Sequence, residues 1–137
     1  VGVLAFRIFW GKQAPENTIH SDVPERVQSF VGCGHAWRLS VWQQIENYPA
    51  WWKFYGEEDF AAYQLFRRNI YVQYEPDVFV QHRVDVKSRK NNSDYQQRLR
   101  RAWRAGWFLM LLFYPLSAFF RSFLYSVSAQ FKNRIFK

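Results

Sequence analysis

A run of three acidic residues, Glu57, Glu58 and Asp59, is the feature of this 137-residue chain that is best suited to chemistry. Adjacent carboxylates repel one another, so the run is favourable only where a positive charge, a helix N-terminus or a proton transfer compensates for the repulsion. A carboxylate can remove a proton from a substrate hydroxyl as a general base. His82 follows Asp59 by 23 positions, at the end of an apolar segment. These four residues are the first candidates for a functional site.

Two explanations of the acidic run remain open. A helix is predicted to begin at Glu57 and to carry Arg67 and Arg68 in its last turn, which places acids at the positive end of the helix dipole and cations at its negative end. Each such placement contributes about 0.3–1 kcal/mol, which is a structural reason for the run. Several aromatic residues precede Gly56, and they favour a chemical role, because loss of solvent raises the pKa of a carboxyl group toward the range useful for a general base.

The elements that must position these residues alternate between strand and helix patterns. Strands are predicted at 3–10, 28–31, 70–74 and 78–81, with a Glu-Pro-Asp turn between the last two. A polar loop follows the first strand. Besides the helix from Glu57, a short helix is predicted to run through Ile45, with Ser40 as its N-cap and Gln43 as the capping-box partner. This alternation predicts an α/β layer structure.

Charge is divided unevenly along the chain. Residues 1–82 hold seven Lys/Arg and nine Asp/Glu, a net charge of −2, whereas residues 83–137 hold twelve and two, a net charge of +10, which together give +8. We therefore predict two parts, divided at 82/83, of which the basic part meets a polyanion such as anionic lipid or nucleic acid. The single cysteine, Cys33, excludes an internal disulfide and a Cys-rich zinc site.

The basic part has a helical pattern with a long uncharged stretch. A helix capped by Asn92, Ser93 or Asp94 is predicted, and it carries arginines at three-residue spacing, at positions 98, 101 and 104. Residues 105–120 contain no charge and are interrupted by Pro115, after which apolar residues recur at amphipathic helical spacing. The stretch is shorter than the roughly twenty residues of a membrane span. A helix in the bilayer interface is favoured, and a helical hairpin that packs on the core or on a second copy is the alternative.

Three segments in this order resemble the C-terminal half of a family-2 glycosyltransferase with the GT-A fold. They are FVGCGHAWRLSVW, which has a Gly-rich turn followed by Arg38; YGEEDFAAYQLFRRN, which has the acidic pair; and IYVQYEPDVFVQH, which ends in His82. The resemblance covers about Val3 to His82. It implies that residues 1–82 form the acceptor-side half of a GT-A (nucleotide-diphospho-sugar transferase) catalytic domain, and that residues 83–137 form a basic linker and membrane-associated amphipathic helices.

The resemblance also implies roles for the candidate residues. Asp59 would be the general base of an inverting transfer and Glu58 the acidic residue that precedes it. His82 would complete the coordination of a divalent metal, Mn²⁺ or Mg²⁺, whose other ligands are expected in an N-terminal nucleotide-binding half. The substrate-binding candidates are Gly32, Gly34, His35, Arg38, Trp51, Trp52 and Glu57. Trp37 and Tyr55 are further candidates for stacking on a sugar ring.

The family's Asp-x-Asp signature, which holds the metal and the donor diphosphate, does not occur in this sequence. The resemblance therefore implies a chain that is inactive without the nucleotide-binding half. The enzyme expected is a hexosyltransferase-type inverting glycosyltransferase of polysaccharide biosynthesis, which transfers a sugar from a nucleotide-sugar donor to a glycan or lipid-linked acceptor. We expect it to be cytoplasmic, peripheral on the inner face of the cell membrane, and able to form a homo-oligomer through its C-terminal helices.

A non-catalytic basic module is the alternative function. It would bind a membrane or a nucleic acid through Arg98, Arg101 and Arg104, because basic charge interleaved with aromatic residues also suits single-stranded nucleic acid. The uncharged residues 105–120 disfavour nucleic acid as the partner, since a nucleic acid would not bury them.

Overall fold

A computed structural model describes residues 1–50, 52, 55–85 and 92–133, and within the last range it describes the side chains of 95–129. The described residues form a mixed α/β structure with one four-stranded sheet and four helices, which confirms the predicted fold class at that level. The chain divides into two units. The first, here the sheet unit, comprises Val1–Tyr48 and Glu58–Val86; the second, here the helical unit, comprises Pro49–Glu57 and Lys87–Lys137.

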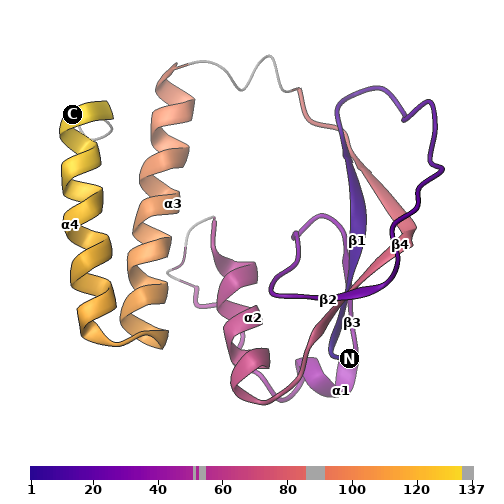
Figure 1. Ribbon diagram of the computed structural model, residues 1–137, viewed down its shortest axis with the longest axis horizontal. Coiled ribbons are helices and arrows are strands. Elements are labelled where there is room, and N and C mark those ends of the chain that lie inside the picture. The colour runs from indigo at the N-terminus through magenta and orange to yellow at the C-terminus, as the bar shows by residue number, and fades with distance from the viewer. Residues whose placement is uncertain (51, 53–54, 86–91, 134–137) are drawn as a thin grey trace. The chain divides into compact units, whose positions relative to one another are not determined.

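The sheet unit is built on four strands in the order β2-β4-β1-β3 (Figure 1). These strands are β1 (Val3–Trp10), β2 (Glu25–Val27), β3 (His35–Trp37) and β4 (Val72–His82). β1 and β4 are parallel at the centre, and β2 and β3 are antiparallel edge strands. The first predicted strand is confirmed with its bounds. The second, predicted at 28–31, was wrong, because the pairing with β4 ends at Val27 and the following residues form a loop.

β4 is one continuous strand, so the Glu-Pro-Asp turn predicted within it was wrong. Pro76 is fully buried and lies at a bulge in β4. The pairing of β4 with β1 shifts between Phe6 and Arg7, which leaves residues 76–78 without partners in β1. A proline has no N–H to donate to a sheet, and an interior strand tolerates it at a bulge, where the ladder is already interrupted.

Two helices belong to the sheet unit, α1 (Leu39–Trp42) and α2 (Glu57–Arg67), the latter beginning where it was predicted. The capping box of Ser40 and Gln43 was wrong. Arg38 is the N-cap of α1 and makes no side-chain capping bond. Its backbone N–H donates to the Gly2 carbonyl at 2.9 Å, so a contact with the start of the chain sets where the helix begins.

A buried cluster joins β1 to both helices. Its members are Val3, Ala5, Phe30, Val41, Ile45, Ala61, Leu65 and Val72. Beside it, Gln64 of α2 is 4% exposed and makes two bonds to the backbone of Glu46. The Gln64 amide oxygen accepts from the Glu46 N–H at 2.8 Å, and its amide nitrogen donates to the Glu46 carbonyl at 3.2 Å. These bonds connect the segment after α1 to α2.

The helical unit contains α3 (Asn92–Phe113) and α4 (Leu116–Asn133), which lie side by side and antiparallel (Figure 1). The indole N–H of Trp107 donates to the Ser126 hydroxyl at 3.1 Å, and the ring centroids of Trp107 and Phe123 are 5.3 Å apart. The predicted start of a helix near 92 is confirmed, whereas its capping side chains lie outside the described residues. None of the described helices is both long enough and apolar enough to cross a membrane.

The paired bonds of Gln64 generate a prediction about stability. The substitution Gln64→Leu keeps most of the buried volume but leaves the Glu46 N–H and carbonyl without their partners, so we expect a loss of about 1–3 kcal/mol in the free energy of unfolding. Urea denaturation of the full chain measures it. Gln28→Leu, at an exposed loop position, is the matched control. Equal stability of the two variants would contradict the importance of the Gln64 bonds.

Candidate functional site

The loop after β2 lies on the first turn of α2. The backbone N–H of Gly32 donates to the Glu58 carboxylate (Oε1) at 3.0 Å, and the Ser29 hydroxyl donates to Asp59 (Oδ1) at 2.8 Å. These two bonds join segments that are 26 and 30 positions apart in the chain. The structure therefore brings together two of the predicted features, the Gly-rich turn and the acidic pair.

The two glycines of this turn are required for space. A Cβ atom at Gly32 would overlap the Glu58 carboxylate, and one at Gly34 would overlap the Ile8 side chain of β1. Neither glycine adopts a positive φ angle. The absence of a side chain at Gly32 is what allows the backbone N–H to reach the carboxylate directly.

The three acidic residues differ in their surroundings. Asp59 is exposed, and apart from its bond to Ser29 it makes no ion pair or hydrogen bond with any described residue. Glu58 is half-buried against the turn. Glu57 has one carboxylate oxygen, Oε2, that is buried and has no hydrogen-bond partner among the described residues. The expectation that the aromatic neighbours remove solvent from the acids is therefore not met at Asp59.

The backbone immediately before α2 is strained. Tyr55 has φ = 78°, and Gly56 has φ = 92°. A residue with a side chain rarely adopts this left-handed conformation, which costs about 1–3 kcal/mol. The indole N–H of Trp52 donates to the Tyr55 carbonyl at 2.7 Å and so stabilises this bend. The strain lies directly beside the acidic run.

Two of the residues predicted to stack on a sugar ring, Trp37 and Trp52, contact other aromatic rings of the chain. Trp37 meets Phe30 and Trp42 edge to face, at centroid distances of 5.6 and 5.0 Å, and lies against the core. Trp52 is half-buried and its ring lies 6.1 Å from that of Phe108 in the helical unit. Trp51 lies outside the described residues.

The remaining predicted residues have structural contacts of their own. The His35 ring lies 4.6 Å from that of Phe30, and its Nδ1 is 3.2 Å from the Val31 carbonyl oxygen. Arg38 is exposed and makes no ion pair with the described residues. His82 ends β4 and its ring lies 4.8 Å from that of Trp10.

A divalent metal at His82 would need ligands from elsewhere. The part of the chain that the structure describes contains no group of three or more His, Cys, Asp or Glu side chains arranged to hold a metal ion. Among these described residues, His82 therefore does not belong to a set of three side-chain ligands.

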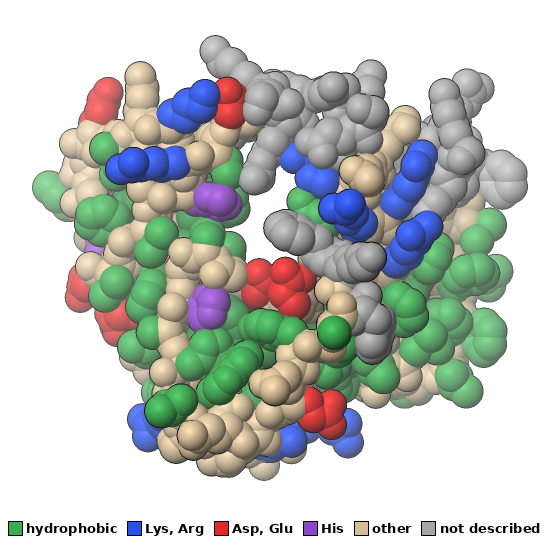
Figure 2. Space-filling model, turned by 180° about the vertical axis from the view of Figure 1, so that it is seen from behind, with side chains coloured by type: hydrophobic (Ala, Val, Ile, Leu, Met, Phe, Trp, Pro, Cys, Tyr) green, Lys and Arg blue, Asp and Glu red, His purple; other side chains and the backbone are tan. Residues whose placement is uncertain are grey.

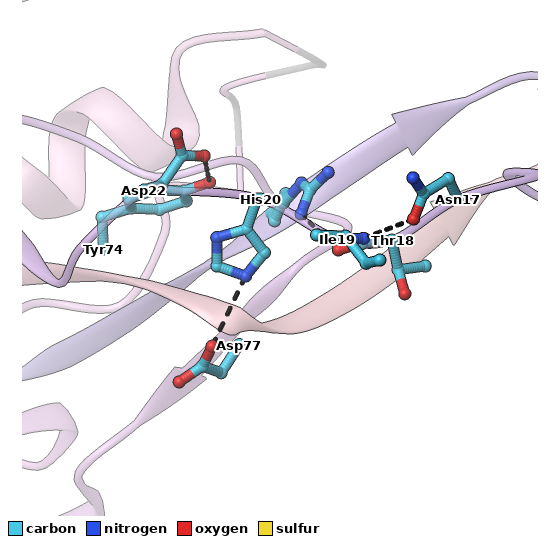
Figure 3. Close-up of polar contacts among 8 residues, drawn as sticks. Asn17, Thr18, Ile19, His20, Asp22, Tyr74 and Asp77 are labelled. Atoms are coloured by element: carbon cyan, nitrogen blue, oxygen red, sulfur yellow. Dashed lines mark hydrogen bonds and ion pairs between the residues drawn. The ribbon is translucent and has the colours of Figure 1, made fainter.

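Sequence reasoning missed a cavity at the β4 bulge. It has a volume of about 470 Å³ and is lined by residues 18–22 together with Pro76, Asp77 and Phe79. Two of its lining residues contact each other: the His20 Nε2 lies 3.4 Å from the Asp77 carboxylate, whereas the His20 Nδ1 is buried without a partner among the described residues (Figure 3). The cavity depends on the bulge, which no local pattern in the sequence predicted.

A second polar contact lies beside this cavity. The Tyr74 hydroxyl is 3.4 Å from the Asp22 carboxylate (Figure 3). Burial raises the pKa of Tyr74, and the negative charge of Asp22 raises it further. The raised pKa extends the pH range over which the Tyr74 hydroxyl is protonated and donates a hydrogen bond to Asp22. None of the predicted site residues lines the cavity.

Comparisons with known proteins do not assign the chain to a family. No family model matches it, and neither a curated protein nor a solved structure was found to be similar to it. The resemblance to family-2 glycosyltransferases thus depends on the three sequence segments alone, and its functional consequences are proposals.

The position of Glu58 can be tested through Cys33, the only cysteine of the chain. Burial raises the pKa of the Cys33 thiol, and the negative charge of Glu58 raises it further. The substitution Glu58→Gln keeps an acceptor for the Gly32 N–H but removes the charge. We expect the pKa of Cys33 to fall, so that more thiolate is present and iodoacetamide reacts faster at pH 8.

The measurement is the rate of Cys33 alkylation by mass spectrometry between pH 7 and 10. Glu16→Gln is the control, because Glu16 makes no contribution to the pKa shift of Cys33. An unchanged alkylation rate in Glu58→Gln, with circular dichroism like that of the original chain, would contradict the placement of Glu58 against the turn.

Proposed function

We propose that the sheet unit is the acceptor-side half of a GT-A-fold, family-2 glycosyltransferase that transfers a sugar with inversion from a nucleotide-sugar donor to a glycan or lipid-linked acceptor. One observation carries the proposal. The Gly-rich turn contacts Glu58 and Ser29 contacts Asp59, while Asp59 stays exposed. A general base needs this combination of a fixed position and access to its substrate.

The proposed reaction assigns one task to each residue of the acidic pair. As the acceptor hydroxyl oxygen attacks the anomeric carbon of the donor, its proton passes to the Asp59 carboxylate. The bond between the anomeric carbon and the donor diphosphate breaks, and the nucleoside diphosphate leaves with the bonding electrons. Ser29 is a positioning residue, because it donates to Oδ1 and leaves Oδ2 without a partner among the described residues. Glu58 orients the turn that carries Gly32.

The other predicted residues enter as secondary parts of the proposal. The exposed guanidinium of Arg38 would pair with a phosphate or carboxylate of a substrate. His82 would contribute one ligand to a Mn²⁺ or Mg²⁺ ion bound mainly by the nucleotide-binding half. Trp51 or Trp52 would contact the acceptor sugar, although the contact of Trp52 with Phe108 makes it the weaker candidate.

A location at the inner face of the cell membrane suits this reaction. If the acceptor is a lipid-linked sugar, attachment through the basic helices lets enzyme and acceptor meet in two dimensions. The basic helical unit supports this part of the proposal, because residues 95–137 contain eight Lys/Arg and no Asp or Glu.

Substitution of Asp59 tests the proposal in the complete natural protein that contains this sequence. Asp59→Asn removes the base while keeping an acceptor for the Ser29 hydroxyl, so we expect kcat to fall by about 10²–10⁴-fold with thermal unfolding unchanged. The assay supplies UDP-glucose, UDP-galactose, UDP-N-acetylglucosamine and GDP-mannose in turn, with a membrane lipid extract as acceptor. Glu16→Gln is the control. Near-normal kcat in Asp59→Asn would remove Asp59 from its role, and no transfer from any donor by the original protein would favour the non-catalytic alternative.

Ser29 provides a second test in the same assay. Ser29→Ala removes one hydrogen bond to the carboxylate, which corresponds to a decrease of about tenfold in kcat with little change in KM. Ser29→Thr keeps a hydroxyl at this position and should restore most of the activity. A loss shared equally by the Ala and Thr variants would indicate that Ser29 matters for packing and does not position Asp59.

A further inference from the structure

The helical unit exposes large apolar side chains around the turn between α3 and α4. Exposed fractions are 50% for Leu112, 62% for Leu116, 57% for Phe120 and 66% for Leu124. In Figure 2, hydrophobic side chains gather at the lower part of this unit, where the turn lies, and Lys and Arg side chains gather above them. Exposed apolar surface of this kind, bordered by charge, is typical of a site that contacts a membrane or another protein.

These exposed residues are not required to hold the two helices together. Trp107 contacts both Ser126 and Phe123 across the hairpin, and Phe119 stacks on Phe123 at a centroid distance of 5.9 Å. Leu109 is buried as well. The hairpin therefore has an interior of its own, and the side chains around the turn are available to a partner.

Charge is absent from the turn end and wholly positive beyond it. No charged residue lies between Arg104 of α3 and Arg121 of α4, and both of these arginines are exposed. Arg101, one turn before Arg104, is exposed as well. Residues 95–137 contain no Asp or Glu, so every formal charge on the side chains of this segment is positive.

We propose that the hairpin inserts its turn end into one leaflet of a membrane that contains anionic lipids, with Arg101, Arg104 and Arg121 at the headgroups. Leu116 precedes Arg121 by five positions and Phe113 follows Arg104 by nine. With a helical rise of about 1.5 Å per residue, these separations correspond to about 8 and 14 Å along the helix axis. Both fit within the roughly 15 Å of hydrocarbon in one leaflet. The inference does not depend on the chain being a glycosyltransferase.

Charge complementarity favours an anionic lipid surface over a second copy of the chain and over a nucleic acid. A second copy of the chain would bring the same arginines toward each other, which disfavours a symmetric dimer through the turn end. A nucleic acid would neutralise the arginines but leave Leu116 and Phe120 in water. Anionic lipid satisfies both parts of the surface, because phosphate groups meet the arginines while acyl chains bury the apolar side chains.

Vesicle flotation tests the lipid preference with the full chain. We expect flotation with vesicles of phosphatidylcholine and phosphatidylglycerol (7:3) and much weaker flotation with phosphatidylcholine alone. Leu112→Glu combined with Leu116→Glu should weaken binding by at least about tenfold. Ser128→Glu combined with Ala102→Glu adds the same charge away from the turn and should retain more of the binding than the leucine pair. Equal loss in both double variants would overturn the role of the turn end.

A fluorescent probe distinguishes insertion of the turn from a helix that lies flat. In a Cys33→Ser background, the environment-sensitive dye NBD is attached at Leu116→Cys or at Ser128→Cys. With the mixed vesicles we expect a blue shift and a rise in emission at position 116 and little change at position 128. Similar changes at both positions would overturn insertion by the turn end. Absence of flotation with the mixed vesicles, or a dimer in light scattering that is lost in Leu116→Glu, would overturn the lipid partner.

Arg104 and Arg121 give the electrostatic part of the test. Replacing either by Gln should weaken binding to the mixed vesicles by about fivefold and leave the weak binding to phosphatidylcholine unchanged. High salt should have the same effect. Binding that is equally strong for both vesicle types, and unaffected by these variants, would contradict the position of the arginines at the headgroups.

Discussion

The hydrogen bond from the Gly32 N–H to the Glu58 carboxylate is the contact on which the candidate site depends. It fixes the loop after β2 on the first turn of α2, and it is possible only because residue 32 has no Cβ atom. The carboxylate also lies at the helix N-terminus, where the dipole stabilises a negative charge. The neighbouring bond from Ser29 to Asp59 follows from the same placement of the loop.

The acidic run therefore has two explanations that apply to different residues. The structural one accounts for Glu58, whose charge is used within the fold to accept a backbone N–H. It does not account for Asp59, which is exposed and makes no ion pair with the described residues, nor for the buried oxygen of Glu57 that lacks a partner among them. An unsatisfied buried carboxylate oxygen costs stability. The chemical hypothesis is thus strongest at Asp59, where a proton acceptor is accessible and its position is fixed.

The sequence predicted those elements whose pattern is local. β1, the start of α2 and the helix after Pro115 were predicted from local signals, namely strand-forming residues, charges at the helix ends and amphipathic spacing. Pro76 was misassigned, because a turn signal and a bulge in a buried strand have the same residue types, and only the register with β1 distinguishes them. The contact of the Gly-rich turn with the acidic pair was not predicted, because it joins segments that are 26 and 30 positions apart in the chain. Among the described candidates for stacking on a sugar, the ring of Trp37 contacts Phe30 and Trp42, and the ring of Trp52 contacts Phe108, which is far away in the sequence.

The uneven distribution of acidic side chains along the chain has an electrostatic explanation. Acidic side chains are confined to the part of the chain before Tyr95. A carboxylate on the helical hairpin would be repelled by anionic headgroups, and one near the turn would have to lose its water to enter the leaflet. A carboxylate that takes up a proton needs the opposite conditions, namely water, a hydrogen-bond donor such as Ser29, and distance from an anionic surface. The same electrostatic constraint therefore accounts for the absence of acids after Asp94 and for the placement of Asp59 in the sheet unit.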